Sequence, residues 1–367
     1  MLTARHTLLR MTAWTWVLPV VSTLLLGLAV AAGTVGPALA VVCGLGLGGA
    51  VVAAVHHAEV IAHRVGEPFG TLVLALAVTV IEASLILSMM VAGGADMAVL
   101  PRDTIYAAVM IIGNGVVGTC LVVGGLAHRE QRFRVEGAGA GMAALVVMCA
   151  LTLVIPTFTT SSPGGTYTIA QLCFVAVSSA ALWAIFVFVQ TIRHRDYFLP
   201  STGADAAAAH APPPTTAEAW TSFALLLVGL VAVVGLAKVL SPAIESAVRA
   251  AGAPQAVVGV AIALLVLLPE SIAAIRCALA DRLQTSMNLA FGSALATIGL
   301  TVPVVVGVCL LLHIPLVLGL SEKDIALLAL TLLVCTIGIE SGGRTSMMLG
   351  AVQLVIFAAF LFLAVVP

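Results

Sequence analysis

Long apolar runs, separated by short polar segments, make up most of the chain. A run of about 20 apolar residues crosses the roughly 30 Å hydrocarbon core of a bilayer as an α-helix. The pattern predicts eleven such spans, and the chain is therefore expected to be an all-α integral membrane protein. The expected spans are residues 13–31, 35–55, 69–91, 104–126, 138–156, 167–190, 220–239, 254–277, 284–311, 324–340 and 346–366.

Composition strengthens this prediction. Of the 367 residues, 62% are hydrophobic and 8% are charged, against roughly 25% charged in an ordinary soluble domain. The formal net charge of −1 favours neither a nucleic-acid partner nor an acidic one. Seven cysteines lie inside or at the rim of apolar runs without a C-x-x-C pair, which is typical of small packing residues.

The first apolar run has one alternative interpretation. Arg5 and Arg10 precede it, as basic residues precede the apolar part of a signal peptide. The run is long and lacks a clear cleavage site of small residues, so it is predicted to be a membrane span.

Basic residues predict the orientation of the chain. With the N-terminus in the cytoplasm, eleven of the fifteen Arg and Lys residues fall on the inner side, as the positive-inside rule requires. These eleven are Arg5, Arg10, Arg64, Arg129, Arg132, Arg134, Arg193, Arg195, Arg276, Arg282 and Arg344, and the other four are Arg102, Lys238, Arg249 and Lys323. The expected location is the cell (inner) membrane, with the C-terminus outside.

The longest hydrophilic segment, residues 193–219, predicts how the chain is divided. Its short Ala and Pro runs are typical of a flexible linker, which the orientation places in the cytoplasm. We expect an N-terminal transmembrane helix in residues 1–34, a first repeat in residues 35–192 and a second repeat in residues 220–367.

An internal repeat supports that division. The first set is Glu59, Gly66, Pro68 and Glu82, and the second is Glu245, Gly252, Pro254 and Glu270. In both sets Gly follows Glu by 7 positions and Pro follows Gly by 2, and the last glutamate follows the proline by 14 or 16 positions. The expected spans place the two sets in opposite orientations, so the chain is predicted to contain two inverted repeats of five helices, as many secondary transporters do.

Glu82 and Glu270 each lie in the middle of an uncharged apolar run. A carboxyl group is costly to hold in hydrocarbon, and an intramembrane acid is by default a functional site. Either glutamate alone could be a protonated, hydrogen-bonded structural group. Their equivalent positions favour a pair that binds a cation or protons, so both are predicted metal ligands.

A hard cation such as Ca²⁺ needs about 6 to 8 oxygen ligands, so further oxygens are expected near the pair. Side-chain oxygens and backbone carbonyls freed by glycine or near Pro269 are candidates. These supporting residues are Thr79, Gly113, Asn114, Asn288, Gly292, Ser293 and Thr297. The alternative for the polar ones is hydrogen bonding between transmembrane helices, and for the glycines close helix packing.

A polar cluster, His56, His57, Glu59 and His63, lies near the expected inner end of the second span. Metal catalysis would need a pattern such as H-E-x-x-H, which the sequence does not contain. A polar amphipathic segment or a pH-sensing gate is the favoured interpretation. Glu67 either complements a helix dipole or recruits ions.

Three functional classes are compatible with a polar membrane interior. A secondary antiporter fits the inverted repeats and paired acids, whereas a channel needs a continuous pore. An intramembrane hydrolase needs a nucleophile and a base at equal depth, and no such His or Asp lies in the interior of a span. No nucleotide fingerprint is present, so an ion gradient is the expected energy source.

We expect a transporter, not an enzyme, without a cofactor and with membrane lipid and inorganic cations as partners.

Four segments resemble ChaA-type calcium/proton antiporters of the cation/calcium exchanger superfamily. They are HHAEVIAHRVGEPFGTLVLALAVTVIEASL from His56, PESIAAIRCALADRLQTSMNLAFGSALATIGLTVP from Pro269, HRDYF from His194 and GRTSMMLGAVQLVIFAAFLFL from Gly343. The resemblance implies a two-repeat exchanger fold whose central carboxylates, here Glu82 and Glu270, bind cation or protons alternately. Exchangers of this superfamily often have Asn three residues before each glutamate, where this chain has Thr79 and Leu267. Ca²⁺/H⁺ antiport is the expected activity, with Na⁺/H⁺ or K⁺/H⁺ antiport on the same site as the alternative.

Overall fold

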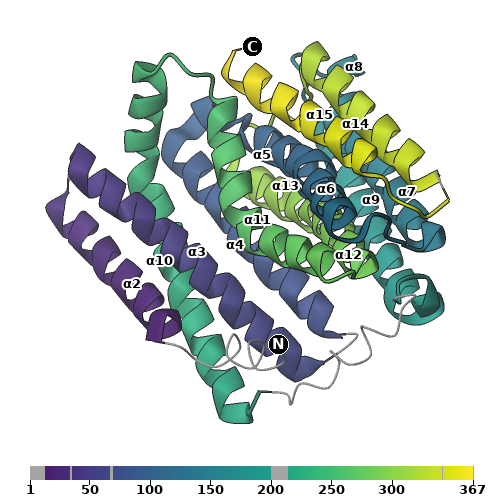
Figure 1. Cartoon of the computed structure of the whole chain (residues 1–367). Coiled ribbons are helices and arrows are strands. Elements are labelled where there is room, and N and C mark those ends of the chain that lie inside the picture. The colour runs from purple at the N-terminus through teal and green to yellow at the C-terminus, as the bar shows by residue number, and fades with distance from the viewer. Residues whose placement is uncertain (1–12, 34, 67–68, 200–213, 341, 367) are drawn as a thin grey trace. The chain divides into compact units, whose positions relative to one another are not determined.

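The computed structural model describes residues 13–33, 35–66, 69–199, 214–340 and 342–366, and these residues form helices joined by loops (Figure 1). Within these ranges no β-strand is formed, and ten helices are long and apolar enough to cross a membrane. The predicted class, an all-α integral membrane protein, is confirmed.

A helix lies at every expected span. They are α2 (Ala13–Ala32), α3 (Pro37–Val65), α4 (Phe69–Gly93), α5 (Leu100–Met110), α6 (Val117–His128), α7 (Val135–Cys149), α8 (Ile155–Phe158), α9 (Ile169–Phe188), α10 (Thr216–Ala250), α11 (Ala256–Leu279), α12 (Leu283–Ala296), α13 (Val302–Leu312), α14 (Glu322–Glu340) and α15 (Met347–Val365). The eleventh expected span, residues 324–340, forms α14. It is not among the ten, and it is charged at both ends, with Glu322, Lys323 and Asp324 at its start and Glu340 at its end.

Four spans contain a π-helical turn, in which the backbone hydrogen bonds run from residue i to i+5. The π-helical segment η2 (Ile111–Val116) joins α5 to α6, and η3 (Ala150–Val154) joins α7 to α8. Segment η7 (Thr297–Thr301) joins α12 to α13, and η4 (Val189–Arg193) extends α9. The first three spans therefore continue across the π turn as one interrupted helix, whereas the span of α9 ends in its π turn.

Two helices extend well beyond the predicted spans. Residues 35–55 and 220–239 were expected to be the helical spans, whereas α3 ends at Val65 and α10 ends at Ala250. Polar residues do not end a helix, but a backbone with positive φ does, and glycine adopts it readily. Gly66 (φ 78°) directly follows α3 and Gly252 (φ 62°) closely follows α10. The repeated glycines of the two sequence sets therefore have an equivalent structural role.

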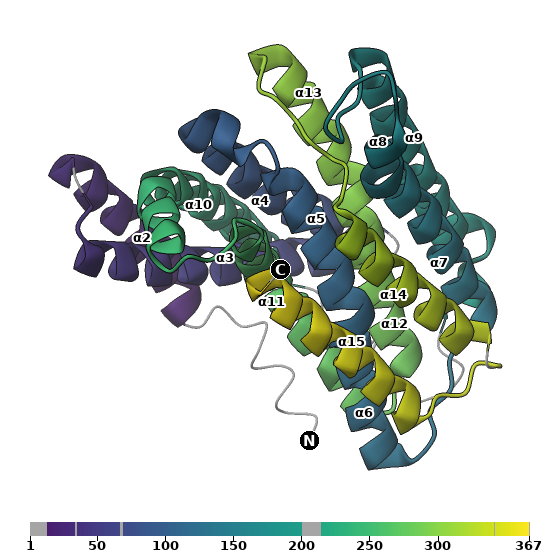
Figure 2. The same cartoon turned by 90° about the horizontal axis from the view of Figure 1, so that it is seen from above.

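The chain forms two compact units. Unit 1 comprises residues 1–97 and 208–252 and contains α2, α3, α4 and α10. In this unit α3 packs against α10, α2 and α4 (Figures 1 and 2). Small side chains allow the close approach, since Ala54 of α3 lies 3.5 Å from the position that a Cβ of Gly229 in α10 would occupy.

Unit 2 comprises residues 98–207 and 253–367. Its helices α14 and α15 lie side by side, and α15 packs along α6 (Figures 1 and 2). The division into units differs from the expected repeats, because α3 and α10, which begin the two repeats, share unit 1. The repeat boundaries remain a prediction, and the central part of the expected linker, residues 200–213, lies outside the described residues.

Loops of unit 2 gather at two opposite ends. At one end, the Phe133 N–H donates to the Gly343 carbonyl (3.0 Å) and the Gln131 side chain donates to Ala278 (2.8 Å). At the other end, the Gly319 N–H donates to Gly165 (2.8 Å). The loops after α6, α11 and α14 thus share one end, as alternating membrane crossings require.

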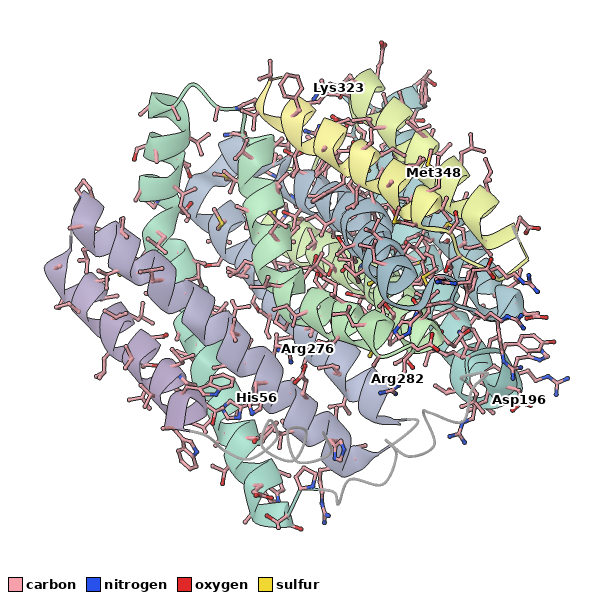
Figure 3. The ribbon with its side chains drawn as sticks, in the orientation of Figure 1. His56, Asp196, Arg276, Arg282, Lys323 and Met348 are labelled. Carbon is pink, nitrogen blue, oxygen red and sulfur yellow. The ribbon has the colours of Figure 1, made fainter. Side chains whose placement is uncertain are left out.

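Charged residues mark these two ends. Figure 3 shows Asp196 and Arg282 at one end of unit 2 and Lys323 at the other. The first end also carries the loops with Arg132 and Arg344, whose backbones pair in an isolated β-bridge. The more basic end is the one predicted to face the cytoplasm.

Gly350→Leu is expected to destabilise unit 2 strongly. A Cβ at Gly350 would lie 2.7 Å from the Gly118 carbonyl oxygen and 2.8 Å from the Leu121 Cβ, at the crossing of α15 and α6. Overpacking of this size costs about 3 kcal/mol, so the melting temperature of the detergent-purified protein should fall by several degrees. Gly307→Leu in α13 is the matched control, because nothing lies within 4 Å of that Cβ position. Equal melting temperatures for the two variants would contradict the close crossing.

Candidate functional site

Glu270 lies on α11 and contacts α12. Its carboxylate Oε2 accepts a hydrogen bond from the Ser293 hydroxyl (2.6 Å). The preceding residue, Pro269, lies inside the helix and has no N–H to donate to the Leu265 carbonyl. The structure therefore brings together two of the predicted site residues, a carboxylate and a hydroxyl, beside an interrupted backbone ladder.

A small cavity of about 10 Å³ adjoins Glu270. Its polar lining consists of Glu270, Ser271 and Ser293, and the rest is apolar: Ile112, Val116, Leu267, Ala274, Leu289 and Ala290. A volume of about 10 to 15 Å³ is what one water molecule needs. The cavity can therefore hold one small polar species against a carboxylate and two serines in otherwise apolar surroundings.

Ser271 was missed by the sequence analysis, although it directly follows Glu270. Its hydroxyl donates to the Leu267 carbonyl (2.7 Å), so the oxygen retains lone pairs for a further partner. A serine inside a transmembrane helix is usually bonded to its own backbone in this way. Only its position in the cavity lining distinguishes it.

Glu82 lies on α4 and is 3% exposed. Thr79, one turn earlier, is equally buried, and its hydroxyl donates to the Ala75 carbonyl (2.8 Å). The threonine oxygen can therefore still accept a bond or ligate an ion. Glu82 belongs to unit 1 and Glu270 to unit 2, so a shared site of the two carboxylates remains a prediction.

The predicted Gly-polar pairs lie on the two spans that correspond in the expected repeats, and both spans contain a π turn. Gly113 and Asn114 lie within η2. Gly292 and Ser293 lie in α12, and η7 begins at Thr297, four residues after Ser293. π turns are frequent at functional sites, and here they interrupt the regular backbone ladder near the predicted ligands.

Two predicted supporting residues, Asn114 and Asn288, do not line the Glu270 cavity. The Asn114 amide is fully buried and donates to the Thr331 hydroxyl on α14 (2.9 Å). The Asn288 amide donates to the Phe198 carbonyl (2.7 Å) and accepts from Gln284 (2.9 Å). Both groups of the Asn288 amide are thus engaged, which favours its alternative role of fastening neighbouring segments together.

The histidine cluster lies on α3. His57 is fully buried and its Nε2 lies 2.9 Å from the Thr15 carbonyl of α2, while the His56 ring lies 5.0 Å from the Trp14 ring. Glu59 and His63 are half-buried, and Glu67 lies outside the described residues. The first two histidines therefore pack between two helices of unit 1 instead of forming a polar helix end.

The common metal-ligating side chains are dispersed along the described part of the chain. Among those residues, no group of three or more His, Cys, Asp and Glu side chains lies close enough together to hold a metal ion. A cation at Glu270 would therefore take most of its ligands from hydroxyls, backbone carbonyls or water.

The sequence matches one protein family over most of its length. The model of the "Sodium/calcium exchanger protein" family matches residues 35–192 and 221–366. The "Putative ionic transporter y4hA" of Sinorhizobium fredii is 46% identical over 362 residues, covering 96% of each chain. The "Sodium-potassium/proton antiporter ChaA" of Escherichia coli is 34% identical over 320 residues, covering 86% of each chain.

Two solved structures have a similar fold. The Ca²⁺/H⁺ antiporter protein YfkE superposes with a TM-score of 0.71 at 15% identity, covering 96% of this chain and 99% of that one. The H⁺/Ca²⁺ exchanger CAX superposes with a TM-score of 0.71 at 18% identity, covering 96% of this chain and 89% of that one. At these identities the likeness establishes the fold alone.

Proposed function

Since the chain belongs to the sodium/calcium exchanger protein family, we propose that it is a secondary antiporter that exchanges a cation for protons by alternating access. The family is one of membrane transporters, not of enzymes. The observation that carries the proposal is the Glu270 carboxylate, which is bonded to Ser293 beside a water-sized cavity within an apolar span. Such a carboxylate binds either a cation or a proton, and this mutual exclusion is the basis of exchange.

The two-repeat architecture is part of the proposal. The family model matches the chain twice, over residues 35–192 and 221–366, which supports the repeat boundaries predicted from the sequence. The equivalent glycines after α3 and α10 and the π turns in equivalent spans support it as well. In this arrangement Glu82 and Glu270 occupy equivalent positions and bind the ion together at the membrane midplane.

Calcium is the proposed cation. The two fold neighbours named above are Ca²⁺/H⁺ exchangers, and two carboxylates with neutral oxygens suit a hard divalent ion. Na⁺/H⁺ or K⁺/H⁺ antiport is the second candidate, because the more similar ChaA is named a sodium-potassium/proton antiporter. Thr79 and Leu267, in place of asparagine, reduce the number of amide ligands near the glutamates.

We further propose that the protein lies in the inner cell membrane, with the N-terminus in the cytoplasm and the C-terminus outside. The basic end of unit 2, which carries Arg132, Arg282 and Arg344, would then face the cytoplasm. An inward proton gradient would then drive proton entry in exchange for cation export.

Transport in everted membrane vesicles tests the function. With an acid interior imposed, addition of the transported cation should release protons, seen as recovery of a pH-sensitive dye. Ca²⁺, Na⁺ and K⁺ are added separately, and vesicles without the protein serve as the control. Cation entry without any proton movement, or flux at channel speed, would contradict antiport.

In Ser293→Ala, protons are expected to compete more strongly with the cation for the Glu270 carboxylate. The Ser293 hydroxyl donates to the Glu270 carboxylate, and such a bond stabilises the ionised form by about 1.5 kcal/mol or more. The cation concentration for half-maximal exchange should therefore rise about tenfold at acid pH and less at alkaline pH. Ser246→Ala on α10 is the control, since this exposed serine bonds only to its own helix. An equal change at all pH values would show that Ser293 acts on packing instead.

A further inference from the structure

A second buried polar cluster contacts η2, the segment whose Ile112 and Val116 line the Glu270 cavity. The amide nitrogen of Asn114, which lies between these two residues in sequence, points to α14. The cluster, called here the Asn114 cluster, consists of Asn114, Met110, Thr331, Cys335 and Gln353. Of these five residues, the sequence had singled out only Asn114 as a site candidate.

Thr331 fixes the orientation of the Asn114 amide. The Thr331 hydroxyl donates its proton to the Leu327 carbonyl (2.8 Å), so its oxygen is left to accept from Asn114 Nδ2 (2.9 Å). The amide nitrogen also points toward the Met110 sulfur (3.9 Å). The Asn114 side-chain oxygen Oδ1 must therefore point away from Thr331.

That oxygen is buried and has no hydrogen-bond partner. Asn114 is 0% exposed, and native structures seldom leave a buried polar atom unpaired without a water, an ion or a functional role. An amide oxygen is a ligand that hard cations accept. The Asn114 Oδ1 atom can therefore bind a partner that the surrounding side chains do not supply.

The same face of α14 also contacts the backbone of η2. The Cys335 thiol, one turn after Thr331, lies 3.6 Å from the Gly113 carbonyl, and Gln353 of α15 donates to that sulfur (3.5 Å). Gly113 permits this approach, because a Cβ there would lie 3.3 Å from the Thr331 methyl group. Helix α14 therefore contacts the π turn at two levels, one through Asn114 and one through the Gly113 carbonyl.

We infer that Thr331 is a positioning residue for cation recognition, holding Asn114 so that its Oδ1 is available to the transported cation. The inference rests on the proposed function and extends it to α14. Thr331 itself does not contact the ion. It limits the rotation of an amide that would otherwise have to be ordered again each time a cation binds.

Thr331→Val tests the inference, because valine keeps the shape and removes the hydroxyl. Initial rates of proton-coupled uptake in proteoliposomes, measured against the concentration of Ca²⁺ and then of Na⁺ and K⁺, give the half-saturating concentration and the maximal rate. The half-saturating concentration should rise about 3- to 10-fold, the size expected for one hydrogen bond, with little change in maximal rate. Thr331→Ser should restore the wild-type value.

Thr336→Val is the matched control on the same helix. Thr336 also bonds to its own backbone, at Leu332 (2.7 Å), but it is exposed. It should leave both constants unchanged. In Asn114→Ala, addition of Thr331→Val should have no further effect, because the amide to be positioned is gone.

A second readout does not depend on transport. Cation-dependent thermal stabilisation of the purified protein should show the same 3- to 10-fold shift in Thr331→Val and none in Thr336→Val. An unchanged half-saturating concentration, or effects of Thr331→Val and Asn114→Ala that add fully, would overturn the inference. A wild-type protein without any cation-driven proton flux would instead overturn the proposed function.

Discussion

Glu270→Gln is expected to abolish cation/proton exchange and to leave the fold intact. Glutamine has the same length as glutamate, and its amide oxygen can still accept the Ser293 hydrogen bond. It carries no charge to bind a cation and no proton that titrates. Exchange should fall to the level of empty proteoliposomes, while the melting temperature changes little. Glu322→Gln, at the exposed first turn of α14, is the control and should retain full activity.

Glu82→Gln is expected to give the same loss. Glu82 is 3% exposed, and a buried carboxylate that served only as a structural group would tolerate an amide of equal size. Substantial exchange in either single variant would show that the two glutamates are not both essential. An experimental structure with the two carboxyl groups more than about 12 Å apart, and protein packed between them, would exclude shared ligation at about 2.3 to 2.6 Å.

Much of the fold was predictable because hydrophobicity alone reports which segments can cross a bilayer. The helix ends were less predictable, because α3 continues to Val65 and α10 to Ala250. At both places the helix ends near a glycine and not at the first polar residue. The signal was present in the sequence, since Gly66 and Gly252 occupy equivalent positions in the two sets. Their structural meaning became clear only with their positive φ angles.

The site was predictable in part, because residue type and position within a span can be read from the sequence. Residue type and depth identify an intramembrane acid and a serine on the next span, and the structure joins Glu270 to Ser293. The direction of a side chain depends on helical phase, and a π turn such as η2 shifts that phase. No sequence pattern indicated this shift, so the contact of Asn114 with Thr331 on α14 could not be predicted.

Exchange through two carboxylates is expected to be electroneutral. Burying an unpaired charge in hydrocarbon is costly, so the states that cross should be those in which both Glu82 and Glu270 are neutralised. One Ca²⁺ neutralises both, as do two protons or two monovalent cations. The expected stoichiometry is therefore one Ca²⁺ for two H⁺, with flux falling at acid pH as protons occupy the shared oxygens.

Membrane potential provides the measurement. A potassium gradient with valinomycin sets the potential across proteoliposomes at a fixed pH gradient, provided that K⁺ itself is not a substrate of the protein. The initial rate of Ca²⁺ uptake should then be nearly independent of the potential, because no net charge crosses. If one charge moved per cycle, a potential of 100 mV would contribute about 2.3 kcal/mol to the driving force, and the rate would respond strongly. Such a response would contradict the two-carboxylate stoichiometry and indicate a third titrating group, for which Glu67 is the sequence candidate.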